Sequence, residues 1–226
     1  MFSNYLYLSA MALIRSAYQD ELDGVSQSLV DLTNMVTASV VKASKAVQSA
    51  DLELAEEVIA TDLKIDEYQH ELDARIIDII ARQQPVASDL RALVTAMRMS
   101  ADLERMGDLA HHIAKVARLR HPDRAIPEAL LLPFTEMGHV AEKLSIMVAT
   151  VIASRDTTMA LQVEKDDDEM DDLHKKVIST IINEGSGLSI ESAIDLTLLG
   201  RYYERYADHA VSVARRVYFL VTGTFA

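Results

Sequence analysis

The feature of this chain that most constrains its fold is an internal repeat. Residues 103–108, Leu-Glu-Arg-Met-Gly-Asp, return 100 residues later as Tyr-Glu-Arg-Tyr-Ala-Asp at 203–208. Upstream, Asp-Leu-Lys-Ile-Asp at 62–66 returns as Asp-Asp-Glu-Met-Asp at 167–171, an offset of 105. All four segments lie in stretches whose apolar residues recur at helical spacing. The chain therefore encodes one helical unit twice.

The composition supports an all-α fold. Good helix formers dominate, whereas the 226 residues include only 7 Gly and 4 Pro. We predict two tandem three-helix bundles, six long helices in all, related by an internal pseudo-symmetry. A three-helix unit exposes an apolar edge, which would be covered if the copies pair side by side or if the protein dimerises.

Apolar periodicity and breaker residues give approximate helix boundaries. We predict helices near 18–48, 51–82, 86–119, 133–154, 156–183 and 189–221. Ser49 or Asp51 is suited to cap the second helix, and Ser189 is suited to cap the sixth. Pro85 separates the second helix from the third, and Gly185–Gly187 is predicted to form a turn.

The middle of the chain contains the best candidate for a linker, because three of the four prolines fall there. Residues 1–14 are apolar and uncharged but lack a basic region and a clear cleavage site, so we expect an arm outside the fold, or a start codon placed too early, rather than a signal peptide. No stretch of about 18 uncharged apolar residues predicts a membrane-spanning helix. The predicted division is an N-terminal arm at 1–14, a first bundle at 15–120, a linker at 121–133 and a second bundle at 134–226.

The net charge of the chain restricts the classes of partner that it can bind. The formal net charge is -13, which disfavours nucleic acid and favours metal cations or basic protein surfaces. The absence of cysteine excludes disulfides and thiolate metal sites. These properties fit a cytoplasmic protein.

Each copy carries two pairs of carboxylates spaced four residues apart, a spacing that places both side chains on one helix face. Neighbouring antiparallel helices can bring the two pairs of a copy together, and four close carboxylates repel unless protons or cations intervene. We predict that they bind hard or borderline cations such as Mg²⁺, Mn²⁺ or iron. The predicted ligands are Asp62, Asp66, Glu104 and Asp108 in the first copy, and Asp167, Asp171, Glu204 and Asp208 in the second.

Two other interpretations stay open. The acids could form solvated faces that pair with arginines such as Arg105 and Arg205, in a helical scaffold that binds no metal. Acids at matched positions in both copies favour a shared site over this. Alternatively, Glu67–His70 and Glu136–His139 match the Glu-x-x-His motif of di-iron bundles. These two motifs occupy non-equivalent positions in the repeat, which favours chance.

Catalytic motifs are lacking. The sequence has no cysteine nucleophile, no Gly-x-Ser-x-Gly elbow and no phosphate-binding glycine loop. His111 and His112 follow Asp108 by about one turn, but a single histidine on a helix face is more often a surface residue than a ligand. We therefore do not expect an enzyme.

The segment 82–91, Arg-Gln-Gln-Pro-Val-Ala-Ser-Asp-Leu-Arg, together with the acidic motifs in 102–108 and 203–210, resembles the PhoU family. These are regulatory accessory proteins of the high-affinity phosphate transport system. The resemblance spans about 15–223 and implies tandem three-helix bundles with multinuclear clusters of iron, zinc or another divalent cation. The family's Glu/Asp-x-x-x-Asp ligands fall on Glu104, Asp108, Glu204 and Asp208, and its acidic second-helix positions fall on Asp62, Asp66, Asp167 and Asp171. The family often has His directly after the Asp of this motif and Asn four residues beyond that Asp, whereas this chain has Leu109 and His112 at these positions in the first copy and His209 and Ser212 in the second.

The resemblance also implies a function. It implies a negative regulator of the phosphate-starvation (Pho) response and of phosphate uptake, and thus a role in phosphate homeostasis. Such a protein would be a cytoplasmic adaptor between the ATPase of a phosphate ABC transporter and a sensor histidine kinase, peripheral to the inner face of the plasma membrane. We expect a homodimer without an organic cofactor. The competing hypothesis is a metal-handling or di-iron helical bundle, which would hold its carboxylates inside an apolar core.

Overall fold

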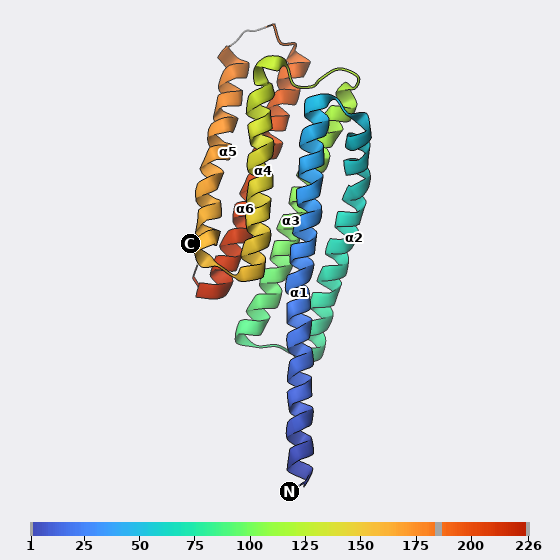
Figure 1. Cartoon of the computed structure of the whole chain (residues 1–226), viewed down its shortest axis with the longest axis vertical. Coiled ribbons are helices and arrows are strands. Elements are labelled where there is room, and N and C mark those ends of the chain that lie inside the picture. Colours follow the sequence, from blue (N-terminus) through green and yellow to red (C-terminus); the bar gives the residue numbers. More distant parts are fainter. Residues whose placement is uncertain (1, 184–186, 225–226) are drawn as a thin grey trace.

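The fold consists of helices alone over the residues that the computed structural model describes, which are 2–183 and 187–224, with side chains from 16–182 and 187–224. Within these residues the chain forms six helices and no strand (Figure 1). They are α1 Phe2–Ser49, α2 Leu52–Gln83, α3 Ala87–Arg120, α4 Glu128–Ser154, α5 Thr157–Asn183 and α6 Ile190–Thr222. The all-α prediction is confirmed. The predicted turn at Gly185–Gly187 lies outside the described residues, apart from Gly187.

Of the two candidate caps for the second helix, the structure selects Asp51, and the predicted cap Ser189 of the sixth is confirmed. The Asp51 carboxylate accepts a 3.0 Å hydrogen bond from the backbone N–H of Leu54, and the Ser189 hydroxyl accepts one of 3.0 Å from Ser192. Each bond satisfies a backbone donor that the first helical turn leaves free.

Two predicted boundaries are corrected. The linker ends at Pro127 rather than at residue 133, because α4 begins at Glu128 and includes Pro133. A proline this close to the start of the helix removes only the backbone bond to Ala129, and its buried ring packs in the core. The first helix starts at Phe2 rather than near residue 18, so residues 2–14 continue α1, which extends past the other helices in Figure 1.

The two repeats pack side by side. Four helices form the centre, where α1 contacts α3 and α4, and α6 contacts the same two helices. On the outside, α2 covers α1 and α3, while α5 covers α4 and α6. Buried apolar side chains from all six helices form one continuous core. This arrangement covers the apolar edge that each three-helix unit would expose alone.

A buried hydroxyl pair joins the repeats inside this core. The Tyr203 hydroxyl on α6 donates a 2.8 Å hydrogen bond to the Ser44 hydroxyl on α1. Burial raises the pKa of Tyr203 far above its usual value, so the phenol stays neutral and acts as a donor.

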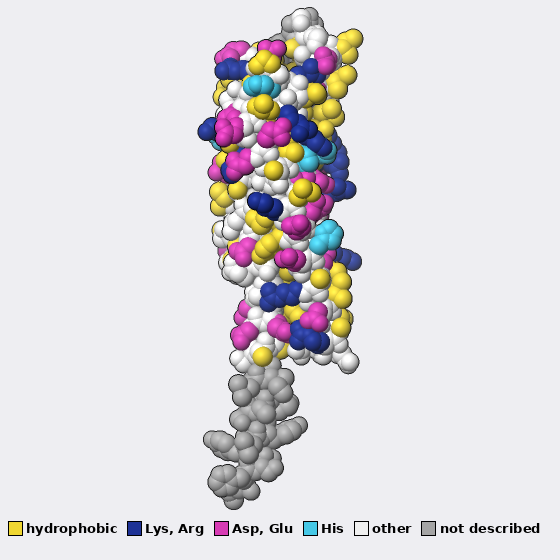
Figure 2. All heavy atoms as spheres, turned by 90° about the vertical axis from the view of Figure 1, so that its right-hand side faces the viewer, with side chains coloured by type: hydrophobic (Ala, Val, Ile, Leu, Met, Phe, Trp, Pro, Cys, Tyr) yellow, Lys and Arg dark blue, Asp and Glu magenta, His cyan; other side chains and the backbone are white. Residues whose placement is uncertain are grey.

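The surface is charged and mixed. In the face seen in Figure 2, acidic and basic side chains are interspersed with hydrophobic ones along the length of the bundle. Among the described residues, no helix is long and apolar enough to cross a membrane.

Candidate functional site

The packing of α2 against α3 brings together the predicted ligands of the first repeat. We call Asp62, Asp66, Glu104 and Asp108 the first acidic cluster. Ile65 lies between the two aspartates on α2, and Gly107 lies between the two acids on α3. A Cβ atom added at Gly107 would lie only 3.0 Å from Cγ2 of Ile65. The missing side chain at Gly107 therefore lets the two acidic helix faces approach closely.

Burial and neighbouring acids raise the pKa values of two carboxylates in the first cluster. The pKa of Asp66 is raised by burial first, and then by the charges of Asp62 and Asp108. The pKa of Glu104 is raised by burial, then by Asp108. Both effects disfavour the ionised carboxylates, so the cluster favours a proton or a cation.

Part of this negative charge already has a partner. Arg105 forms an ion pair with Asp108, and His111 contacts Asp62 through Nδ1. The other oxygen of Asp62, Oδ1 of Asp66 and Nε2 of His111 are buried and have no hydrogen-bond partner. Only one other such atom, the Tyr18 hydroxyl, occurs among the described side chains. Unsatisfied polar atoms thus concentrate in the first acidic cluster, where each costs free energy unless a ligand meets it.

The packing of α5 against α6 repeats this arrangement in the second copy. We call Asp167, Asp171, Glu204 and Asp208 the second acidic cluster. Burial, followed by the charges of Asp171 and Asp208, raises the pKa of Asp167 to about 7. Burial and then Asp208 raise the pKa of Glu204, although Arg201 forms an ion pair with that carboxylate. All eight predicted ligands therefore lie in two matched clusters.

The residue types of both clusters fit a divalent cation, since carboxylate oxygens and imidazole nitrogen are the ligands that such ions take from proteins. The side chains are not arranged around an ion as they stand, because no three Asp, Glu or His in the described residues are grouped closely enough to hold one. In the first cluster, Arg105 pairs with Asp108 and His111 contacts Asp62, so both side chains occupy carboxylates that a cation would otherwise contact.

The two Glu-x-x-His motifs do not form a di-iron site. One lies on α2 and the other on α4, and these helices do not contact each other. His70 is exposed and contacts the backbone carbonyl of Asp66 through Nδ1 at 2.7 Å, and His139 is also exposed. The interpretation of these motifs as a chance match agrees with the structure.

An ion-pair network across the repeat boundary was not expected from the sequence. Asp102 on α3 contacts Nδ1 of His209 at 3.1 Å and accepts a 2.7 Å bond from Nε of Arg216, both on α6. Burial alone would raise the pKa of Asp102, but the bonds from His209 and Arg216 lower it overall. Because His209 follows Asp208, this network connects the second acidic cluster to the first repeat. The repeat gave no signal for it, since the equivalent of Asp102 is Tyr202.

A second contact across the boundary involves the first cluster. His112 stacks on the Tyr202 ring of α6 with ring centroids 5.2 Å apart, and on His111 at 5.9 Å. Burial and then the neighbouring His111 lower the pKa of His112. Each acidic cluster therefore has an adjacent histidine that touches the other repeat.

Comparison with known proteins covers both repeats. A family model described as PhoU domain matches residues 29–117 and 134–217. Over 94% of its length the chain is 42% identical to the whole of the "Phosphate-specific transport system accessory protein PhoU homolog 2" of Mycobacterium tuberculosis. It is 36% identical to PhoU homolog 1 of the same species, over 93% of this chain and 95% of that protein.

Solved structures share the fold. The phosphate transport system regulatory protein PhoU from Streptococcus pneumoniae superimposes with a TM-score of 0.84 at 26% identity, covering 92% of this chain and 99% of that one. PhoU from Pseudomonas aeruginosa gives a TM-score of 0.83 at 28% identity, covering 92% and 100%.

Proposed function

Since this chain belongs to the PhoU family, as its motifs suggested, we propose that it is a regulatory accessory protein of phosphate-specific transport. The observation that carries the proposal is the 42% identity to a phosphate-specific transport system accessory protein across that protein's whole length. We propose that it is a negative regulator, which lowers phosphate uptake and the phosphate-starvation response when phosphate is plentiful.

In this proposal the protein acts as a non-enzymatic adaptor between the transporter's ATPase and a sensor histidine kinase at the inner face of the membrane. Its exposed apolar side chains support a role in binding other proteins. On α6, Ile190, Ile194 and Leu198 form an exposed stripe, and Leu90 and Val94 occupy the equivalent positions on α3. An adaptor transmits a signal only if the state of one partner changes its affinity for the other.

The test is a reporter of phosphate-starvation genes in phosphate-replete cells. Deleting the gene, together with any paralogue, should derepress the reporter, and wild-type protein should restore repression. A variant with Ile190→Ser and Ile194→Ser should restore it poorly, whereas Leu132→Ser, at another exposed apolar position on α4, should restore it fully. An unchanged reporter in the deletion strain would refute the proposed function.

We also propose that the two acidic clusters bind divalent cations such as iron or zinc, which support the structure or its contacts with partners. The unsatisfied oxygens of Asp62 and Asp66 and the raised pKa of Asp167 favour this. A bound cation would neutralise the carboxylates, and the acids and His111 would orient it.

Metal content measured by mass spectrometry of the purified protein tests this second proposal. Replacing both Glu104 and Asp108 by Ala should remove metal from the first cluster without unfolding the bundle. The control replaces Glu53 and Glu57 on the exposed face of α2, which have the same spacing. Unchanged metal content in the first variant would disprove the assignment. Light scattering of the same samples tests the expected homodimer.

A further inference from the structure

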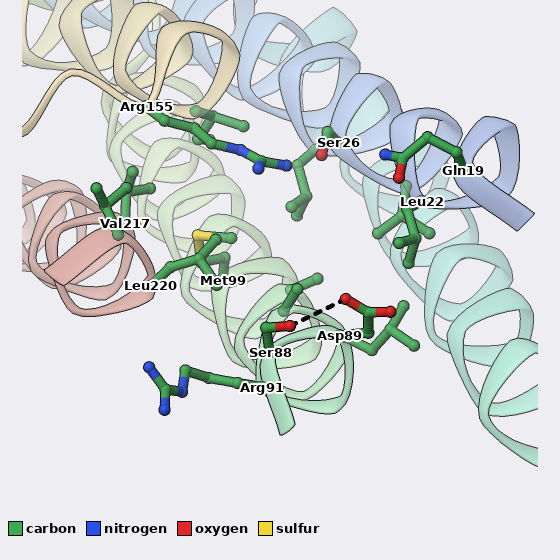
Figure 3. Close-up of a pocket in the computed structure, with 17 residues that line it drawn as sticks. Gln19, Leu22, Ser26, Ser88, Asp89, Arg91, Met99, Arg155, Val217 and Leu220 are labelled. Carbon is green, nitrogen blue, oxygen red and sulfur yellow. Dashed lines mark hydrogen bonds between the residues drawn. The ribbon is translucent and has the colours of Figure 1, made fainter. Parts of the chain in front are cut away.

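An apolar pocket opens at one end of the four central helices, far along α3 from its acidic cluster. Its volume is about 440 Å³, within the range typical of small-molecule sites. Figure 3 shows side chains from both repeats around it. Leu22 and Leu29 come from α1, Met99 from α3, and Val217 and Leu220 from α6. We call this cavity the end pocket.

The opposite end of the central helices is closed by the linker. His121 contacts the Ala50 carbonyl through Nδ1 at 3.1 Å, and Ala125 and Ile126 are buried in the core. At the end that carries the pocket, the described chain turns through the short connections α2–α3 and α4–α5, α1 continues outward and α6 ends, so no segment comparable to the linker lies across this end among the described residues. The pseudo-symmetry of the fold is therefore broken at the end pocket.

Side-chain size also contributes to the difference between the open end and the closed end of the central helices. Ala96 lines the end pocket, whereas its equivalent 100 residues later is the buried Leu196. Leu29 also lines the pocket, and its equivalent 105 residues later is the buried Phe134. The smaller residue stands on the pocket side in both pairs, which leaves space that the other end fills.

Arg155 supplies a positive charge to this apolar space. It follows α4 with a φ of 56°, and its repeat equivalent Ala50 follows α1 with the same φ of 56°. Alanine therefore suffices for the left-handed turn, and the arginine side chain has no role in forming it. In Figure 3 the Arg155 guanidinium extends across the pocket toward Ser26. It forms no ion pair with a carboxylate of the described residues.

Two other charged residues, Arg91 and Asp89, also line the end pocket. Arg91 lies over the Phe219 ring, with its guanidinium carbon 5.5 Å from the centroid, and points away from the other labelled side chains in Figure 3. Asp89 accepts a 3.2 Å bond from the Ser88 hydroxyl. Asp23 lines the adjoining groove of about 340 Å³, which shares Arg155.

We propose that the end pocket binds an amphipathic monoanion, such as a medium-chain fatty acid. The aliphatic tail lies among the apolar side chains of both repeats, where each buried methylene is favourable. The carboxylate accepts hydrogen bonds from the Arg155 guanidinium, a charge-assisted contact next to an apolar surface. Because its walls come from both repeats, the bound ligand holds them together and stabilises the fold.

The test uses the full chain and a fluorescent fatty acid, dansyl-aminoundecanoate, displaced by decanoate or decanol. Decanoate should displace the probe and raise the melting temperature. Ala96→Leu places in the pocket the residue that the chain already tolerates at Leu196, and it should abolish binding of both competitors. Unchanged binding in Ala96→Leu would overturn the location of the site.

A separate variant tests the role of Arg155. Arg155→Ala copies Ala50 and should fold, and it should weaken decanoate binding about tenfold while leaving decanol binding unchanged. Arg124→Ala in the linker is the control for loss of one positive charge and should bind like wild type. Equal decanoate affinity in Arg155→Ala and wild type would overturn the proposal.

Vesicles of phosphatidylglycerol distinguish a free amphiphile from a bilayer. The proposal expects decanoate to bind below its micellar concentration without vesicles. If decanoate fails to bind while the protein cosediments with vesicles and Arg155→Ala does not, the ligand is a membrane surface and the proposal is wrong.

Discussion

Replacing Gly107 by Ala tests how the first acidic cluster is held together. The added methyl group would lie 3.0 Å from Cγ2 and 3.2 Å from Cδ1 of Ile65, both closer than ordinary contacts. Ile65 is almost fully buried between α2 and α3, so it has little room to move. The methyl group should therefore push apart the two helices that carry the cluster.

The expected magnitude combines two opposing effects. Overpacking in a dense core costs about 1–3 kcal/mol. Alanine in place of glycine within a helix contributes about 1 kcal/mol of stability in return. The net result should be a loss of about 1 kcal/mol in the free energy of unfolding. The second repeat has Ala207 at this position, so the close approach is specific to the first.

Urea unfolding of the variants measures the net change in the free energy of unfolding and tests whether the contact with Ile65 causes it. Ile65→Ala alone should cost about 2–5 kcal/mol through the cavity that it creates. In that background the two close contacts are absent, so Gly107→Ala should stabilise the protein by about 1 kcal/mol. The sign of the glycine substitution should thus reverse. An equal loss in both backgrounds would refute the contact between Gly107 and Ile65 as the cause.

Three further predictions concern the core, the repeat boundary and the second cluster. Asp102→Asn should lower the free energy of unfolding by about 1–2 kcal/mol, measured in urea, because the charge that His209 contacts is lost. Tyr203→Phe should cost about 1 kcal/mol by leaving the buried Ser44 hydroxyl without its donor, and adding Ser44→Ala should recover part of the loss. Because the pKa of Asp167 is raised to about 7 in the folded state, the folded protein binds this proton more tightly than the unfolded chain does. That stability is fully present below the ordinary value of 3.8 and is lost as the pH rises through about 7, so urea midpoints in the presence of a chelator should fall over this range in wild type and less in Asp167→Asn.

The sequence predicted the features that depend on neighbours within one helix. Helical periodicity gave the six elements, and Asp51 and Ser189 marked two helix starts, because a cap is a contact over three residues. The prediction that α4 starts at Pro133 was wrong. A helix can include a proline in its first two turns, and the ring of Pro133 is buried, which local sequence does not reveal. The sequence also placed each carboxylate pair on one face, and repetition identified which pairs belong together.

The contacts between helices were decided only by the tertiary structure. The pairing of α1 with α4 and of α3 with α6 chose the side-by-side arrangement, and it brought Asp102 to His209 across 107 residues of chain. The packing also places the linker over one end of the core and leaves the end pocket, which Arg155 lines, at the other end. Such contacts follow from the distance and direction of side chains on separate helices, which a local pattern does not specify. The repeat by itself therefore determined the helices and their acids, and packing determined where the two copies differ.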